Sequence, residues 1–517
     1  MKKIIMGSAS VVALLAAAPA LAQSNTSDVD QDGSDNIAVV DQTGSGGNSE
    51  VDQLGTSNDA DVEQTGAGDD STVAQTGEGN EADIVQSGGA TSAVAQYNAE
   101  NDAPIEGNSA TVTQAGASVS DLRQLGENLI ATVDQTGDDN DSYFDQGGPP
   151  PPEANKEGDR DTTGSVVQSG SFNVSDLRQR ADDAQATVTQ TGTGNDSTVF
   201  QGAGTNSQFD ENGDRAIATV IQTGDDNRSV LNQGNDDVTA DVTQNTAGVS
   251  SGGFPTNDSL VTQNARFGRV VVDQTGVGNQ STVTQGTAGR SSIANINQTN
   301  MTGGTLNVSS VSQAGVRANA DVDQNGEGNS STVTMSADRA SGAVAQADVN
   351  QDGADNTSLL TQRSDSFAYV DQIGEGNYSD VNQAVGSAGS IADVNQLGEL
   401  GISDIDQTGA GNLATVNQSL SSLLEDSNIQ QTGTNGEVIV SQSGESNDSD
   451  VLQGGDLNNA YVTQAGFDNS SLIVQGGSSN TATVSQYSDG NISTVSQNGA
   501  GNSATVTQGM SSPPVVN

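Results

Sequence analysis

The chain has 517 residues, with 67 Asp plus Glu against 15 Lys plus Arg, and it contains no His, Cys or Trp. Without His or Cys it has no Ser-His-Asp triad, thiol nucleophile, disulfide scaffold or zinc site of the usual ligands, so only carboxylate catalysis stays open. Its net charge of -52 is the opposite of the basic surface that binds nucleic acid or anionic lipid. With 32% hydrophobic and 3% aromatic residues, the composition favours a disordered acidic chain or a repetitive structure over one large core.

Residues 1–22 are typical of a secretory signal peptide. Lys2 and Lys3 precede an apolar run that ends at Ala18, and Ala20-Leu21-Ala22 precede Gln23 as small-residue cleavage signals. The apolar run is too short for a spanning helix, and no later segment is apolar enough to cross a bilayer. We therefore expect cleavage after Ala22 and a mature chain that is secreted and has no membrane span.

Residues 23–508 repeat with a period of eleven, which is clearest in the glutamines. With each Gln as position 0, the interval reads Q-x-G-x-G-N-x-(A/S)-x-V-x. The interval from Gln75 to Gln86 has the full form, with Gly77, Gly79 and Asn80 at positions 2, 4 and 5.

This spacing predicts one β-strand in each interval. Positions 5, 7, 9 and 11 are two apart, so their side chains share one face of a strand, while positions 8 and 10 point to the other face. The glycines at positions 2 and 4 let the chain reverse. A helical period is absent, and Gly and Asn at fixed positions would break a helix.

Two such strands make one turn of a solenoid. We predict an all-β fold: a flat two-sheet β-solenoid of stacked 22-residue repeats, each of two eleven-residue intervals, with looped insertions. Its thin interior holds Val, Ala and Ser with rows of Gln and Asn, whose stacked amides form hydrogen-bonded ladders. The residues predicted to form these structural ladders are Gln31, Gln42, Gln53, Gln64, Gln75, Asn80, Gln86, Gln190, Asn195, Gln274, Asn279, Gln407, Asn412, Gln442, Gln453, Gln464, Gln475, Gln486, Gln497, Asn502 and Gln508.

The period is disturbed at several places, where we predict irregular insertions, and residues 509–517 form a C-terminal tail. Gln146 and Gln168 are 22 residues apart, so the proline-rich segment between them is expected to replace about one strand and to loop out. Such insertions are either tolerated at solenoid turns or grafted binding loops. The irregular stretches are 97–113, 147–167, 202–221, 245–262, 286–312 and 336–350.

The motif Q-x-G-x-G-N-x-A-x-x-x-Q resembles the curlin repeat of curli fibre subunits, the secreted functional amyloids of Gram-negative bacteria. It is carried by Gln75, Gly77, Gly79, Asn80, Ala82 and Gln86, and again by Gln497, Gly499, Gly501, Asn502, Ala504 and Gln508. The resemblance implies export through an outer-membrane secretion pore and self-assembly into surface fibres, with a related minor or nucleator subunit as a further partner. It also implies a role in biofilm matrix and adhesion.

The acidity of the chain leads to a separate expectation. Outward carboxylates stack one rung, that is one solenoid turn, apart, as Asp41 with Glu63 or Asp61 with Asp83 would. Such like charges repel, so salt or divalent cations should promote assembly. We expect no catalytic residue, cofactor or dedicated metal site, beyond weak Ca²⁺ association with the acidic faces.

Other readings of the repeat stay open. The chain is alternatively a monomeric secreted acidic repeat adhesin, or a calcium-binding β-roll-like surface protein. A β-roll repeats every nine residues, and this chain repeats every eleven. An ice-binding solenoid would need regular outward Thr, which is irregular here. A carboxylate glycosidase would need one particular pair among 67 acids, and none stands out.

Overall fold

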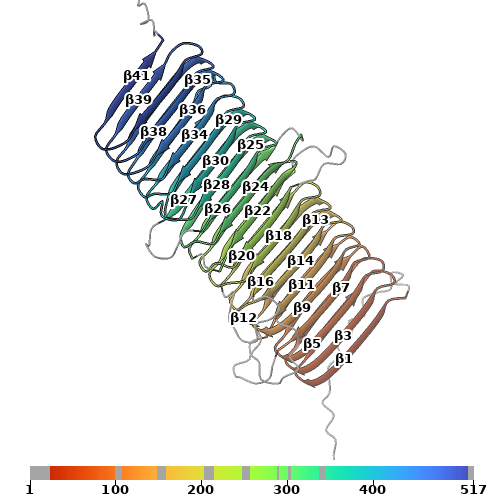
Figure 1. Cartoon of the computed structure of the whole chain (residues 1–517). Coiled ribbons are helices and arrows are strands. Elements are labelled where there is room, and N and C mark those ends of the chain that lie inside the picture. Colours follow the sequence, from red (N-terminus) through yellow and green to blue (C-terminus); the bar gives the residue numbers. More distant parts are fainter. Residues whose placement is uncertain are drawn as a thin grey trace, which may run out of the picture. The chain divides into compact units, whose positions relative to one another are not determined.

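The computed structural model describes residues 24–98, 107–147, 159–202, 215–246, 257–287, 290–300, 304–336 and 344–509. The described residues form strands and turns without a helix. The chain divides into two compact units: residues 1–250 with 259–263, and residues 251–258 with 264–517. In both units the strands alternate along the chain between two sheets (Figure 1).

We name the two sheets of each unit by a residue at position 7. The serine sheet has Ser there in every strand except the two-residue β12, as in Ser49 and Ser71, and the alanine sheet usually has Ala, as in Ala60 and Ala82. In the first unit, the strands of the serine sheet are β1 (Thr26–Ser34), β3 (Asn48–Thr56), β5 (Asp70–Glu78), β7 (Thr91–Tyr97), β9 (Val119–Glu127), β11 (Asp141–Gly147), β12 (Asp159–Arg160), β14 (Val174–Arg180), β16 (Asp196–Gly202), β18 (Arg228–Gln233) and β20 (Asp258–Gln263). Its alanine sheet has β2 (Ile37–Gln42), β4 (Asp59–Gln64), β6 (Glu81–Ser87), β8 (Ser109–Ala115), β10 (Ile130–Thr136), β13 (Thr163–Ser171), β15 (Gln185–Thr193), β17 (Ile217–Thr223) and β19 (Thr239–Asn245).

The second unit repeats this arrangement. Its serine sheet has β22 (Asn279–Gln285), β24 (Asn307–Gln313), β26 (Ser330–Met335), β28 (Thr357–Gln362), β30 (Tyr378–Gln383), β32 (Ile402–Gln407), β34 (Asp426–Gln431), β36 (Asp448–Gln453), β38 (Ser470–Gln475) and β40 (Ile492–Gln497). Its alanine sheet has β21 (Arg269–Gly276), β23 (Ile293–Asn300), β25 (Ala318–Glu327), β27 (Ala345–Ala354), β29 (Phe367–Glu375), β31 (Ile391–Gln396), β33 (Leu413–Gln418), β35 (Glu437–Glu445), β37 (Asn459–Phe467), β39 (Thr481–Gln486) and β41 (Ser503–Gln508).

Neighbouring strands of a sheet are parallel and in register, so like residues lie over like residues. In the first unit Ser49, Val51 and Gln53 of β3 pair with Ser71, Val73 and Gln75 of β5. Along β5 the inward residues are buried, whereas the outward Thr72 is exposed. The structure therefore confirms the predicted two-sheet β-solenoid with about 22 residues per turn.

The turns stack closely, and this explains the fixed glycines. Gly55 at position 2 has φ +127°, and a Cβ atom there would overlap the carbonyl oxygen of Gly77 in the next rung. Position 4 lies in the left-handed region even where glycine is replaced, as at Asp35 with φ 59° and Phe172 with φ 58°. The turn geometry is thus kept by the stack when the sequence departs from the motif.

The interior adapts to side chains of different size by compensating pairs. Phe144 occupies the position of the usual valine in β11 and is 0% exposed. Gly164 of β13 replaces the usual alanine in the facing sheet, and a Cβ there would overlap the Phe144 ring. The larger side chain in one sheet is therefore accommodated by the smaller one in the other.

The irregular stretches are narrower than the sequence predicted. The prediction for 286–312 is corrected, because it contains all of β23 and most of β24, and β8, β13, β17, β20 and β27 each enter one of the other stretches. The spacing of the glutamines changes there because turns lengthen, while the strands keep their register. The proline-rich segment also replaces no strand, since β11 of the serine sheet is followed by β13 of the alanine sheet. The expected signal peptide, most of the tail, the proline-rich residues and the centres of the other insertions lie outside the described residues.

Candidate functional site

Stacked glutamines form a buried ladder in each sheet. Gln53 accepts a hydrogen bond from Gln31 Nε2 at 2.6 Å and donates from its own Nε2 to Gln75 Oε1 at 2.8 Å. The same Nε2 also donates to the carbonyl of Ile37 in the facing sheet at 2.7 Å. Both amide hydrogens are therefore used, which is what allows a polar group in a dry interior.

The predicted ladder glutamines divide between the two sheets. Those in the serine sheets are Gln31, Gln53, Gln75, Gln407, Gln453, Gln475 and Gln497, and those in the alanine sheets are Gln42, Gln64, Gln86, Gln190, Gln274, Gln442, Gln464, Gln486 and Gln508. Within each unit each of them bonds to the glutamine of a neighbouring rung through its side chain, as Gln464 Nε2 does to Gln486 Oε1 at 2.9 Å.

A second ladder of asparagines begins the strands. Asn195 donates from its backbone N–H and from Nδ2 to Asn173 Oδ1, at 3.1 and 3.0 Å, and Nδ2 also reaches the Gly224 carbonyl at 2.8 Å. Asn80, Asn279 and Asn502 make the same pair of bonds to the asparagine one rung before them. Asn412 differs, because Ser390 Oγ replaces the preceding amide as its acceptor. These bonds tie each turn to the next rung, a link that the sequence pattern alone did not specify.

Three residues interrupt the ladders. Met335 stands in a glutamine position, so Gln313 Nε2 meets its Sδ at 3.8 Å and the buried Oε1 of Gln362 has no donor. Asp69 replaces an asparagine and accepts from the backbone N–H groups of Gly66, Gly89 and Ala90.

Glu425 also replaces an asparagine, and it is 0% exposed. Its two carboxylate oxygens accept from the backbone N–H and Nδ2 of Asn447, at 2.9 and 3.0 Å. Burial raises the pKa of Glu425 to about 7, against the opposing effect of these two hydrogen bonds. A group that titrates near neutral pH therefore lies inside the ladder.

Outward carboxylates stack along the sheets as expected. Asp61 lies in register with Asp83, and Asp41 with Glu63. Partial burial, followed by the charges of Asp83 and Asp41, raises the pKa of Asp61 above its usual value. Elsewhere an amide separates the acids: Asn325 Nδ2 donates to Asp352 at 3.0 Å, and Asn297 Nδ2 to Asp323 at 3.0 Å.

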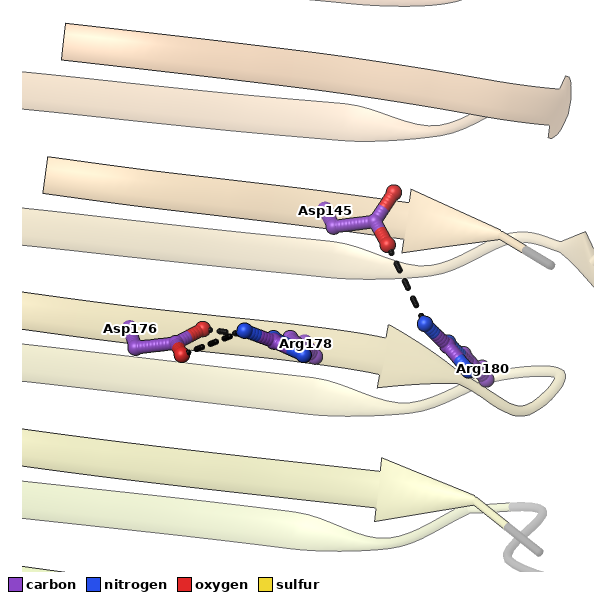
Figure 2. A network of polar contacts seen from close by, with 4 residues as sticks. All are labelled: Asp145, Asp176, Arg178 and Arg180. Atoms are coloured by element: carbon purple, nitrogen blue, oxygen red, sulfur yellow. Dashed lines mark hydrogen bonds and ion pairs between the residues drawn. The ribbon is translucent and has the colours of Figure 1, made fainter. Parts of the chain in front are cut away.

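An arginine cluster on the outer face of the first unit was missed at the level of sequence. Figure 2 shows Asp145 of β11 reaching towards Arg180 at the end of β14, at 3.5 Å, and Asp176 paired with Arg178 at 2.7 Å. Arg178 also lies over the Tyr143 ring, 5.1 Å from its centre. Burial raises the pKa of Asp145, although Arg123 and Arg180 oppose the rise. The available signal was the placement of arginines at outward positions of neighbouring rungs in an acid-rich chain.

The described residues offer little to catalysis or metal binding. Among them no group of three or more His, Cys, Asp or Glu side chains is placed to hold a metal ion. A hollow of about 280 Å³ on the alanine sheet of the second unit is lined by amides, hydroxyls and Leu397, with no ionisable group. The described part of the chain also has no helix long and apolar enough to cross a membrane.

Comparison with known families decides between the readings of the repeat. The model of the curlin associated repeat matches residues 22–55, 55–88, 444–477 and 477–509. The chain is a curlin-repeat protein. No curated protein matches it.

The array of this curlin-repeat protein begins and ends in open strand edges. Among the described strands, β1 pairs only with β3 and β2 only with β4, while β40 pairs only with β38 and β41 only with β39. Inward residues that are buried in the middle of each unit are half-buried or exposed in β1, β2 and β41. These edges present unpaired backbone groups, as a template for further strands would.

Proposed function

We propose that this curlin-repeat protein is a structural subunit of extracellular curli-like amyloid fibres on the surface of a Gram-negative bacterium. The subunits assemble by stacking their open strand edges, and the fibres serve biofilm matrix, cell adhesion and surface attachment. The chain acts without a catalytic site. Its further partners are an outer-membrane secretion pore and a related minor or nucleator subunit.

The observation that carries this proposal is that the amide ladders stop at both edges without a cap. Gln475 Nε2 donates to Gln497 Oε1 at 2.9 Å, and Gln497 in turn donates to the Thr481 carbonyl. The next ladder bond would need another glutamine above Gln497, which only a further rung supplies. Together with the curlin repeats, this favours addition of another copy over a capped monomer.

The experiment is assembly of the exported chain, purified and diluted from denaturant. We expect thioflavin-positive fibres by negative-stain microscopy, with a fibre-diffraction reflection at about 4.7–4.8 Å. A chain that folds to a β-rich monomer and never elongates would contradict the proposal and would support the monomeric adhesin instead.

A further inference from the structure

The two ends of the array differ sharply in charge. The first rung, β1 and β2 with their turn, carries Asp28, Asp30, Asp32, Asp35 and Asp41, and all five side chains are exposed. Residues 490–509, which contain β40 and β41, carry no Asp, Glu, Lys or Arg. Their outward positions are Thr, Ser and Asn, so one end of the array is acidic and the other is neutral but rich in hydrogen-bond donors.

This difference, together with the ladders, restricts how two copies can meet. Two acidic ends face to face would bring five carboxylates within about one strand spacing, roughly 4.8 Å, of five others. Two neutral ends face to face would have to pair antiparallel, which places Gln497 opposite the start of the partner strand instead of opposite another Gln. Only the contact between an acidic and a neutral end keeps strands parallel and glutamines stacked.

We propose that the neutral C-terminal edge of one copy binds the acidic N-terminal edge of a second copy, with β40 pairing with β1 and β41 with β2. This proposal rests on the proposed function, and it gives the fibre a fixed polarity. Gln497 then continues the ladder to Gln31, and Gln508 continues it to Gln42. Ser493 falls on Ser27 and Ala504 on Ala38, so both the serine and the alanine columns continue across the seam.

Hydrogen bonds inside the chain show how the seam holds the acids. At position 1, Asn325 donates to Asp352 of the next rung at 3.0 Å, and Asn498 would stand over Asp32 in the same relation. At position 10, Asn297 donates to Asp323 at 3.0 Å, and Ser496 would stand over Asp30. The neutral edge thus supplies donors where the acidic edge supplies acceptors.

The test places charge on the neutral edge. In S496D/N498D, the two new carboxylates face Asp30 and Asp32 of the incoming copy but only Val474 and Gly476 inside their own chain. We expect elongation on preformed wild-type seeds to slow at least tenfold, and a few per cent of this variant to cap growing wild-type fibres. The matched control is T483D/S485D, which adds the same charge one rung inside, between the uncharged neighbours Tyr461, Thr463, Thr505 and Thr507. It should elongate within about twofold of wild type.

The opposite charge guards against misfolding as an explanation. S496K/N498K should elongate faster than wild type at low salt, and the advantage should disappear at high salt, where the pairs are screened. Wild-type rates for both edge variants, or equal slowing of S496D/N498D and the control, would overturn the seam while leaving fibre formation intact. Failure of the wild type itself to elongate would instead overturn the proposed function.

Discussion

Glu425 shows how one residue can change the behaviour of an otherwise uniform ladder. It takes the place of an asparagine, and Gly401 occupies the same place in the preceding rung of the serine sheet. Gly401 has no side chain to donate to the carboxylate, so Asn447 is the partner of both oxygens. The sequence marks Glu425 only as a departure from the motif, because its burial depends on which turns stack above and below.

The first prediction concerns pH. The pKa of Glu425 is about 7 in the folded chain, against an ordinary value of 4.5, so the folded state holds a proton that the unfolded state releases. Its contribution is fully present below about pH 4.5 and is lost as the pH rises through 7. The difference corresponds to roughly 3 kcal/mol at 1.36 kcal/mol per pKa unit. Urea unfolding at pH 4, 6 and 8 should show wild type losing stability relative to Glu425→Gln across this range.

Stacked aspartates with raised pKa values, such as Asp348, give a background trend of the same sign in both proteins. The quantity to compare is therefore the difference between wild type and Glu425→Gln. A difference that does not change between pH 4 and pH 8 would contradict the assignment.

At the scale of the strand, the period of eleven predicted the strands, their inward faces and the glutamine column of each sheet. It did not separate the serine sheet from the alanine sheet, although the alternation of Ser49, Ala60, Ser71 and Ala82 contains that information. It also misplaced β23 and β24, because glutamine spacing reports turn length as well as strand position. The pairing of Phe144 with Gly164 could not be predicted, since it depends on contacts between sheets.

The second prediction concerns the ladder break in β26. Replacing Met335 by Gln should let residue 335 accept from Gln313 and donate to Gln362, whose buried Oε1 has no donor in the described structure. A buried unpaired acceptor costs about 1–3 kcal/mol, while the lost apolar contact of methionine offsets part of this gain. We expect net stabilisation of about 1 kcal/mol, measured as a shift of the urea midpoint.

Val333→Gln provides the comparison for Met335→Gln. Val333 is a buried residue of the same strand that lies on the valine column, where no amide ladder exists. It should be destabilising. Stabilisation by both substitutions, or by neither, would show that completing the ladder is not the cause.

At the scale of the whole molecule, charge is distributed in three ways that composition could not distinguish. Acids stack on acids at Asp61 and Asp83, amides separate acids at Asn325 and Asp352, and arginines compensate acids around Asp145. The first arrangement opposes folding of the array, whereas the other two do not. The net charge therefore overstates the repulsion between rungs, and the stacked acids decide how strongly the solution matters.

The third prediction follows from these stacks. Calcium or added salt should shorten the lag before thioflavin-positive assembly several-fold, because it reduces repulsion between carboxylates of neighbouring rungs while the chain folds. The effect should be weaker in a variant in which Asp61 is replaced by Asn. Equal lag times with and without calcium would contradict this prediction.

The division into a serine sheet and an alanine sheet also bears on how such a gene can change length. Recombination that adds or removes 22 residues leaves every later strand on the sheet to which its serine or alanine belongs. A change of eleven residues would move all later strands to the opposite sheet and would place serines over alanines at the junction. The number of repeats can therefore drift between generations in steps of two strands, and single-strand gains or losses are expected to be rare among descendants of this gene.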